Sequence, residues 1–237
     1  MKYIACRDYD EMSRQAGAAL IGDIRRFPRQ VLCTATGNSC LGLYQWLATR
    51  HKEDPSLFKQ LGIVKLDEWG GMDETDPASC EAYLRTHVTG PLQISEDRYI
   101  GFSNRNPSPE KECERIDQAL ARHGGIGSCI LGLGVNGHIG FNEPADFLVA
   151  GSHKASLSRS SKMHGMLQKS NGSPEFGLTL GMGTIMRSRK VILLLSGDGK
   201  HAVIEELLQG RISTRLPASF LWMHPDVTFL RDMESTG

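Results

Sequence analysis

The sequence has no excess of charge of either sign, because 27 lysine and arginine residues balance 27 aspartate and glutamate residues. A chain without a net electrostatic field is not drawn to nucleic acid or to an anionic membrane surface. We therefore expect neither nucleic acid nor a membrane as a partner. A phosphate-bearing ligand needs a local site, and the expected partner is a small molecule.

The sequence also lacks paired cysteines and long apolar runs. Its six cysteines form no C-x-x-C motif, and several lie in apolar runs where a free thiol packs as a small hydrophobic group. Neither a metal site nor a disulfide is predicted. The first residues, MKYIACRDYDEM, carry charge too early for the apolar part of a signal peptide, and no apolar run reaches the length of a membrane span. We expect a soluble protein of the cytoplasm.

Short β-type runs alternate with segments of helical periodicity. The runs predicted as strands are 30–36, 63–69, 98–102, 128–134, 178–182, 190–197 and 227–230. Runs as apolar as CILGL and VILLL are typical of strands covered on both faces, so the sequence predicts an α/β fold with a mostly parallel sheet and helices on either side. Ligands of such sheets bind at the carboxyl ends of the strands. One core of this kind fits the length, and we expect a single domain over 1–237.

Local signals define one helix and one unusual loop. A helix is predicted over 110–123, with Ser108 as N-cap, Pro109 at the first helical position, and two glycines after its end. Apolar residues of helical period predict further helices around 12–24 and 203–208. By contrast, Gly151–Ser173 is rich in Ser, Lys, Gly and His and poor in apolar residues. Long loops in compact domains usually have a function, so we predict a lid over about 151–176 rather than a plain loop.

The stretch LGLGVNGHIGFNEP, Leu131–Pro144, combines several glycines with a histidine and a glutamate. Its glycines match G-x-G-x-x-G, but a dinucleotide site also needs a helix beginning at the glycines and an acid about twenty residues later. FNEP interrupts any helix, and 154–157 contains no acid, so a dinucleotide is not predicted. Two interpretations remain: a tight turn in which His138 caps a neighbour, or an acid–base site in which Glu143 orients His138.

A second candidate site is VKLDEW, where Asp67 and Glu68 follow an apolar strand. Neighbouring side chains on a strand point to opposite sides, so one carboxylate can face a cleft while the other faces solvent or a partner group. A helix N-cap is the alternative, and the pattern leaves both open.

Two glycine turns are candidate phosphate sites. In TATGNSCLGLY a strand runs into Gly37, Asn38 and Ser39 and then into a helix, which offers an anion backbone N–H groups and hydroxyls. Many such units bind nothing, and without the Walker lysine ATP is not implied. In SGDGKH, Lys200 begins a helix, where a cation opposes the helix dipole unless an anion is bound. A bound phosphate resolves that conflict, and a solvated surface lysine is the alternative.

Together these stretches resemble the glucosamine-6-phosphate deaminase/isomerase family, whose signature LG-x-G-x-(N/D)-GHI-x-FNEP is present at Leu131–Pro144. The resemblance extends over most of the chain, through the stretches TGNS, LDEW, LTLGMGTIM and SGDGKHA, the last followed by PASFLWMH. LDEW and PASFLWMH are most similar to the galactosamine-6-phosphate isomerase branch. The resemblance implies a Rossmann-like three-layer α/β/α fold shared with 6-phosphogluconolactonases. It also implies conversion of an amino sugar 6-phosphate and water to a ketose 6-phosphate and ammonium, with no metal or cofactor.

The resemblance further implies roles for individual residues. Asp67 would move a proton between C2 and C1, His138 would open the pyranose ring, and Glu143 and Asn136 would hold the histidine. Four residues are implied for the phosphate: Gly37, Asn38, Ser39 and Lys200. The residue chemistry fits these roles, because an imidazole that titrates near ambient pH suits ring opening and a partly buried carboxylate suits proton transfer at C2.

The chain departs from the family pattern in three places. Many members have Asp where this chain has Asn136, which can orient a histidine but cannot share its proton, so we expect the pH profile to be affected. The phosphate-binding arginine of the lid has no clear counterpart; His164 lies near its place, and Arg159 and Lys162 are candidate replacements. The chain ends early, at Gly237, so the allosteric N-acetylglucosamine-6-phosphate site and the hexamer of some relatives are not expected. A homo-oligomer is left open.

Two other functions are compatible with the scaffold. One is a 6-phosphogluconolactonase, against which FNEP after GH argues. The other is a sugar-phosphate-binding regulator without catalysis, against which the intact set of Asp67, His138 and Glu143 argues. Between the two C4 epimers we prefer galactosamine-6-phosphate, and this preference rests on the branch resemblance alone. The residues themselves do not indicate the epimer, because discrimination of one hydroxyl depends on polar groups that the fold positions.

Overall fold

The computed structural model describes residues 1–104, 106–163, 165–170 and 173–236, and strands alternate with helices along them. The strands are β1 (Lys2–Cys6), β2 (Val31–Thr34), β3 (Gly62–Lys65), β4 (Asp67–Gly70), β5 (Tyr99–Ile100), β6 (Ser128–Gly132), β7 (His153–Ala155), β8 (Phe176–Thr179), β9 (Lys190–Leu195) and β10 (Val227–Asp232). The α-helices are α1 (Tyr9–Arg26), α2 (Asn38–Glu53), α3 (Cys80–Leu84), α4 (Pro109–Arg122), α5 (Arg159–Lys162), α6 (Met182–Met186), α7 (His201–Leu208) and α8 (Met233–Thr236). Shorter or wider helical turns are η1 (Arg85–Thr89), η2 (Glu96–Arg98), η3 (Gly165–Lys169) and η4 (Pro217–Met223).

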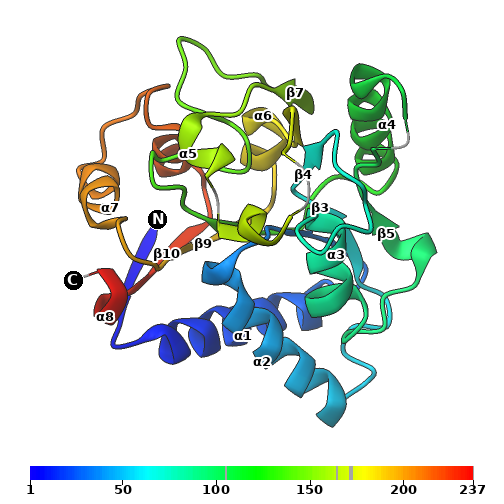
Figure 1. Ribbon diagram of the computed structural model, residues 1–237. Coiled ribbons are helices and arrows are strands. Elements are labelled where there is room, and N and C mark those ends of the chain that lie inside the picture. Colours follow the sequence, from blue (N-terminus) through cyan, green and yellow to red (C-terminus); the bar gives the residue numbers. More distant parts are fainter. Residues whose placement is uncertain (105, 164, 171–172, 237) are drawn as a thin grey trace.

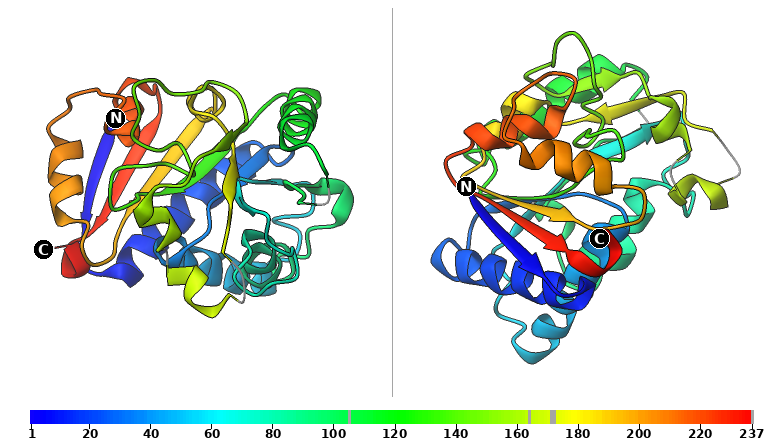
Figure 2. Two further views of the ribbon diagram at one scale, coloured as in Figure 1. Left: turned by 45° about the horizontal axis from the view of Figure 1, so that its top comes forward. Right: turned by 90° about the vertical axis from the view of Figure 1, so that its left-hand side faces the viewer.

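The main sheet has seven strands in the order β1-β10-β9-β6-β2-β3-β5, and each neighbouring pair is parallel. Helices α1 and α2 cover one of its faces, while α7 and the small second sheet lie on the other (Figures 1 and 2). The predicted α/β fold with a mostly parallel sheet between helical layers is therefore confirmed. The run Val191–Leu195 is fully buried, as expected for a strand covered on both faces.

The predicted helix start at Ser108 is confirmed in detail. The Ser108 side chain accepts a hydrogen bond from the backbone N–H of Lys111, Pro109 occupies the first turn, and α4 ends before Gly124 and Gly125, both with positive φ. The buried face of α4 includes Cys113 and Ile116. The serine cap, the proline and the glycines thus act as the sequence signals predict.

The prediction of one continuous strand over 63–69 is wrong. The chain leaves the main sheet at Leu66, whose N–H donates to the carbonyl of Thr34, and Asp67–Gly70 then forms β4 in a second, antiparallel sheet of order β4-β8-β7. Alternation of apolar residues does not change at Leu66, so periodicity gives no sign of the switch between sheets. The strand β1 was not predicted, because its residues are exposed apart from Cys6 and partly Ile4.

The segment predicted as a lid is not an unstructured loop. It contributes β7 to the second sheet, then the single turn α5, then η3. A small apolar cluster lies beneath it, formed by Trp69, Met72, Ala78, Cys80, Phe141 and Ala155, with Leu157 and Leu167 packed on its edge. This cluster is separate from the large core around the main sheet.

Within the described part of the chain, no helix is long and apolar enough to span a membrane. The six cysteines are buried free thiols.

Candidate functional site

The order of the strands defines where a ligand site is expected. The chain proceeds from β2 to β3 and β5 on one side of β2, and then from β6 to β9 and β10 on the other side. Adjacent strands β2 and β6 therefore form a switch point, and ligands of open α/β sheets bind in the crevice outside the carboxyl ends of such strands. The turns that follow β2, β6 and β9 hold Gly37–Ser39, Leu133–Glu143 and Ser196–Lys200, so most sequence-predicted residues lie at this edge.

The loop after β6 is a set of tight turns, not the start of a helix. Gly137 and Gly140 have positive φ values of 83° and 57°, and the N–H of Gly134 donates to the carbonyl of His138. A Cβ built on Gly134 would lie 2.4 Å from atoms of the His138 ring. The glycine at 134 thus leaves the space that the imidazole occupies. A tight turn and a positioned histidine occur together, so the two interpretations left open by the sequence do not exclude each other.

Asn136 connects His138 to Glu143 through both ends of its amide. Its Nδ2 donates to Glu143 Oε2 at 2.9 Å, and because a carboxylate only accepts, Oδ1 must face the histidine. Oδ1 lies 2.7 Å from His138 Nδ1 and also accepts the backbone N–H of His138. Nδ1 therefore carries the proton in the neutral ring, which leaves Nε2 as the basic nitrogen. The chain Glu143–Asn136–His138 fixes both the orientation and the tautomer of the imidazole.

Glu143 is an ionised carboxylate held from two sides. Burial alone would raise its pKa, but hydrogen bonding and charge interaction with His138, and hydrogen bonds from Ser161 and Asn136, lower it to about 2. Its Oε2 lies 3.4 Å from His138 Nδ1. Its Oε1 accepts the Ser161 hydroxyl and, at 3.3 Å, the backbone N–H of Ser158. No sequence signal predicts these two serines, which lie fifteen and eighteen positions further along the chain.

Asp67 is buried, with 7% of its surface exposed, and it begins β4. Burial and the negative charge of Glu68, against the opposing charge of Lys65, together raise its pKa from 3.8 to about 7. The Cys80 thiol donates a weak hydrogen bond to its carboxylate at 3.8 Å. A carboxyl group with this pKa exchanges a proton near neutral pH, as a general base requires.

Glu68 points to the opposite side of β4, as strand alternation predicts, but it contacts neither cleft nor solvent. It is fully buried and accepts the Lys65 ammonium at 2.7 Å. It also accepts the backbone N–H groups of Cys80 and Glu81, at 3.0 and 2.9 Å. Glu68 thereby accepts the first N–H groups of α3, a helix that begins twelve residues later. The N-cap residue of this helix is Ser79, whose side chain accepts the N–H of Ala82, so neither Asp67 nor Glu68 is the N-cap that the alternative required.

The loop that holds His138 packs against the strand that holds Asp67. A Cβ on Gly140, two residues after His138, would lie 3.4 Å from Asp67 Oδ2 and 2.7 Å from the Thr179 hydroxyl. Thr179 pairs with Asp67 across β4 and β8, and its hydroxyl accepts the N–H of Phe141. The histidine loop therefore lies directly against the strand pair that carries the aspartate. The sequence did not identify Thr179.

The two predicted phosphate turns also meet. The Ser39 hydroxyl donates to the carbonyl of Ser196 at 3.0 Å, and the Lys200 ammonium donates to the Ser39 hydroxyl at 3.2 Å. Gly37 precedes α2 with φ 106°, and no side chain caps the first N–H groups of this 16-residue helix, at Asn38 and Ser39. Burial lowers the pKa of Lys200, although the nearby Cys40 opposes the shift. Lys200 is thus not a solvated surface lysine but a cation at an open helix N-terminus.

Helix α3 joins the phosphate turn to Asp67. The Tyr83 hydroxyl donates to the carbonyl of Gly37 at 2.9 Å. The Cys80 thiol lies 3.6 Å from the Thr36 hydroxyl and contacts Asp67 on its other side. The turn at 36–39, the base candidate and the histidine loop therefore surround one region at the carboxyl edge of the sheet.

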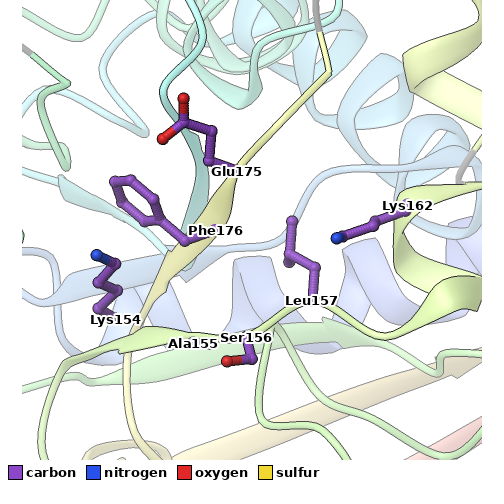
Figure 3. A pocket seen from close by; sticks show the side chains of 7 residues that line it. All are labelled: Lys154, Ala155, Ser156, Leu157, Lys162, Glu175 and Phe176. Carbon is purple, nitrogen blue, oxygen red and sulfur yellow. The ribbon is translucent and has the colours of Figure 1, made fainter.

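The candidate lid cations lie away from these contacts. Arg159 is exposed. Lys162 lines a cavity of about 430 Å³ with Lys154, Leu157, Glu175 and Phe176, and the two lysines approach it from opposite sides (Figure 3). Lys154 lies over the Phe176 ring. His164 lies outside the described residues. Among the residues that the structure describes, no group of three His, Cys, Asp or Glu side chains is placed to hold a metal ion.

Comparisons of the sequence and of the structure find similar known proteins. The model of a family described as glucosamine-6-phosphate isomerases/6-phosphogluconolactonase matches residues 7–229. The chain is 39% identical over 217 residues to "Putative deaminase AgaI" of Escherichia coli (strain K12), covering 92% of this chain and 86% of that protein. It is 33% identical over 239 residues to a glucosamine-6-phosphate deaminase of Bacillus velezensis, covering 100% and 99%. A solved structure of a monomeric glucosamine-6-phosphate deaminase matches with a TM-score of 0.94 at 33% identity, over 99% of this chain and 98% of that chain.

The contact between Gly134 and the imidazole gives a first prediction. Gly134→Ala will displace the His138 ring and break its bond to Asn136, because the new Cβ would lie 2.4 Å from ring atoms. Two-bond ¹H–¹⁵N couplings should show the Nδ1–H tautomer for His138 in the wild type and a tautomer mixture in the variant. Gly132→Ala is the matched control, since its Cβ would meet nothing nearer than 3.8 Å. An unchanged spectrum for Gly134→Ala would contradict the assigned packing.

The pKa of Asp67 gives a second prediction. Because the folded protein holds this proton to about pH 7, whereas the ordinary pKa of an aspartate is 3.8, the wild type loses stability as the pH rises through that window. Asp67→Asn removes the effect. The melting temperature of the variant should exceed that of the wild type by several degrees at about pH 8, and the difference should vanish near about pH 4. The exposed Asp10→Asn should show no such growing difference, and a wild type more stable than Asp67→Asn at about pH 8 would refute the argument.

Proposed function

The chain belongs to the family of glucosamine-6-phosphate isomerases and 6-phosphogluconolactonases, and on this basis we propose that it is an amino sugar 6-phosphate deaminase/isomerase. The reaction converts an amino sugar 6-phosphate and water to the ketose 6-phosphate and ammonium. The proposal rests on one observation above all: the loop that holds His138, with its fixed Nδ1–H and basic Nε2, packs against the strand that holds Asp67, a buried carboxyl group whose pKa is raised to about 7.

Ring opening is the task proposed for His138. The ring opens when a proton leaves the anomeric hydroxyl and another reaches the ring oxygen. Nε2 can accept the first proton and then donate it to the ring oxygen, and the transient imidazolium is stabilised by ionised Glu143 3.4 Å from Nδ1. Asn136 keeps the ring oriented during both transfers, although it cannot take up the proton itself.

Proton transfer at carbon is the task proposed for Asp67. In the open-chain amino aldehyde, its carboxylate removes the proton from C2 while the aldehyde oxygen gains the proton that the C2 ammonium loses, which gives an enolamine. The resulting acid returns its proton to C1 and leaves an iminium group at C2, which water hydrolyses to the ketone and ammonium. A carboxyl pKa near 7 suits both directions, because the group is a stronger base than an exposed carboxylate and is partly ionised at neutral pH.

The substrate phosphate is proposed to bind at the start of α2. The backbone N–H groups of Gly37, Asn38 and Ser39 lie at the N-terminus of this helix. Lys200 adds a positive charge beside Ser39. In this proposal residues 1–237 act as one domain, with 151–176 as its lid. We further propose galactosamine-6-phosphate as the preferred substrate, because LDEW and PASFLWMH are most similar to that branch. The six buried free thiols are consistent with the reducing cytoplasm expected for such an enzyme.

An ammonium assay tests the proposal. Purified protein should release ammonium from galactosamine-6-phosphate, and more slowly from glucosamine-6-phosphate. Asp67→Asn and His138→Gln should each lower kcat by about a hundredfold to ten-thousandfold, the range typical of a lost acid–base group. Folded protein that releases no ammonium from either sugar would refute the function. Hydrolysis of 6-phosphogluconolactone in that case would identify a lactonase, and tight substrate binding without turnover would identify a regulator.

The pH dependence of the reaction tests the role of Asp67 separately. Because the carboxylate is the active form, kcat/KM should fall as the pH drops below about 7. Glu68→Gln removes a charge that raises the Asp67 pKa, so the acid limb should move to lower pH. Glu96→Gln, which removes an exposed carboxylate, is the control and should leave the limb unchanged. An acid limb that stays in place in Glu68→Gln would contradict the assignment of this limb to Asp67.

A further inference from the structure

Glu143 is contacted by two separate parts of the chain, one on each carboxylate oxygen. Oε2 receives Asn136 and lies near His138, which belong to the same loop as Glu143. Oε1 receives the hydroxyl of Ser161 and the backbone N–H of Ser158, which belong to segment 151–176. The carboxylate that supports the proposed ring-opening histidine therefore receives two of its three hydrogen bonds among the described residues from this segment.

The Ser161 hydroxyl points out of α5 to Glu143 rather than to a carbonyl of its own helix. Ser161 is 2% exposed, whereas its neighbours Lys162 and Met163 are exposed. A serine in a helix commonly bonds to a carbonyl of its own preceding turn. Here the hydroxyl instead donates to a carboxylate eighteen residues away.

Ser158 extends the contact into a short relay. Its hydroxyl caps α5 by accepting the N–H of Ser161, and it lies 3.1 Å from the Ser161 hydroxyl, to which it donates. Proton donors in series polarise one another, so the last bond, to Glu143, is strengthened. The relay forms only when the turn at 158–161 lies against the histidine loop, because every donor to Oε1 comes from that turn.

We propose that Ser161 is a positioning residue for ring opening that acts through Glu143. Glu143, Asn136 and His138 are correctly arranged only when the turn at 158–161 lies against the histidine loop. This inference rests on the proposed function and adds a residue to it. With the segment in place, Glu143 is held and presents Oε2 to Asn136 and His138. With the segment displaced, Oε1 loses its donors, the carboxylate turns toward water, and the tautomer and orientation of His138 are no longer fixed.

The proposal separates ring opening from substrate binding. Ser161→Ala should lower kcat for the cyclic substrate by about tenfold to a hundredfold, the range for a lost hydrogen bond to a charged group. KM should change by less than about threefold, because Ser161 does not contact the phosphate turn. The reduced, ring-free 2-amino-2-deoxyhexitol 6-phosphate should bind the variant and the wild type equally in calorimetry, since it needs no ring opening.

Three further variants make the test specific to the contact. Ser161→Thr retains the hydroxyl and should restore most of kcat. Ser156→Ala makes the same change at an exposed position of the same segment and should behave as the wild type. In a Glu143→Gln background, Ser161→Ala should cost less than about twofold, because the carboxylate through which it acts is already gone.

Each result decides for or against the inference. Full activity of Ser161→Ala, a full additional loss in the Glu143→Gln background, or weaker binding of the ring-free probe would each overturn it. Should Ser161→Ala unfold, the comparison of Ser161→Thr with the wild type carries the test, and a folded Ser161→Thr that loses kcat or binds the ring-free probe more weakly would overturn the inference. Wild-type protein that releases no ammonium contradicts the proposed function itself, whereas active wild type with an unaffected Ser161→Ala contradicts this inference alone.

Discussion

The fully buried ion pair between Lys65 and Glu68 is the interaction on which the arrangement of the cleft depends. Lys65 ends β3 in the main sheet, Glu68 lies in β4 of the second sheet, and the chain between them changes sheet within one residue. Burial lowers the pKa of Lys65, but the charges of Glu68 and Glu81 outweigh it and raise the pKa, so the ammonium stays charged. An unpaired charge at this depth would cost several kcal/mol, which is why the pair fixes the bend so firmly.

Asp67 is positioned by that same pair. The bend places Asp67 against the histidine loop, and the bonds from α3 to Glu68 bring Cys80 against it. Burial raises the pKa of Asp67, and the Glu68 charge adds to this shift while the Lys65 charge opposes it. One buried carboxylate therefore organises a helix, an ion pair and the proton affinity of its neighbour. A base near neutral pH is obtained at a cost in folding stability, since an ionised Asp67 is destabilising where it lies.

Local sequence signals predicted the frame of the molecule because their physical causes are local. The apolar runs CILGL and VILLL became central parallel strands, and the Ser108 cap and the glycines after α4 bound their helix as expected. The turns with Gly37 and Lys200 could be predicted to face an anion, because the dipole of a helix N-terminus is a property of the helix itself. The motif LGLGVNGHIGFNEP likewise gave the histidine set, since Asn136, His138 and Glu143 lie within eight residues.

Contacts between distant segments could not be predicted in the same way. Periodicity continues through Leu66 although the chain changes sheet there, and nothing in RSSK distinguishes the buried hydroxyl of Ser161 from the exposed side chains beside it. Thr179 and Cys80 are also ordinary residues until the fold places them beside Asp67. These residues share one feature: each joins the histidine loop or the aspartate to a segment that the sequence places elsewhere. Short motifs thus supply the reacting groups of the candidate site, whereas the contacts that position these groups arise from long-range packing. A family signature alone therefore specifies the reacting groups but not the residues that hold them in place.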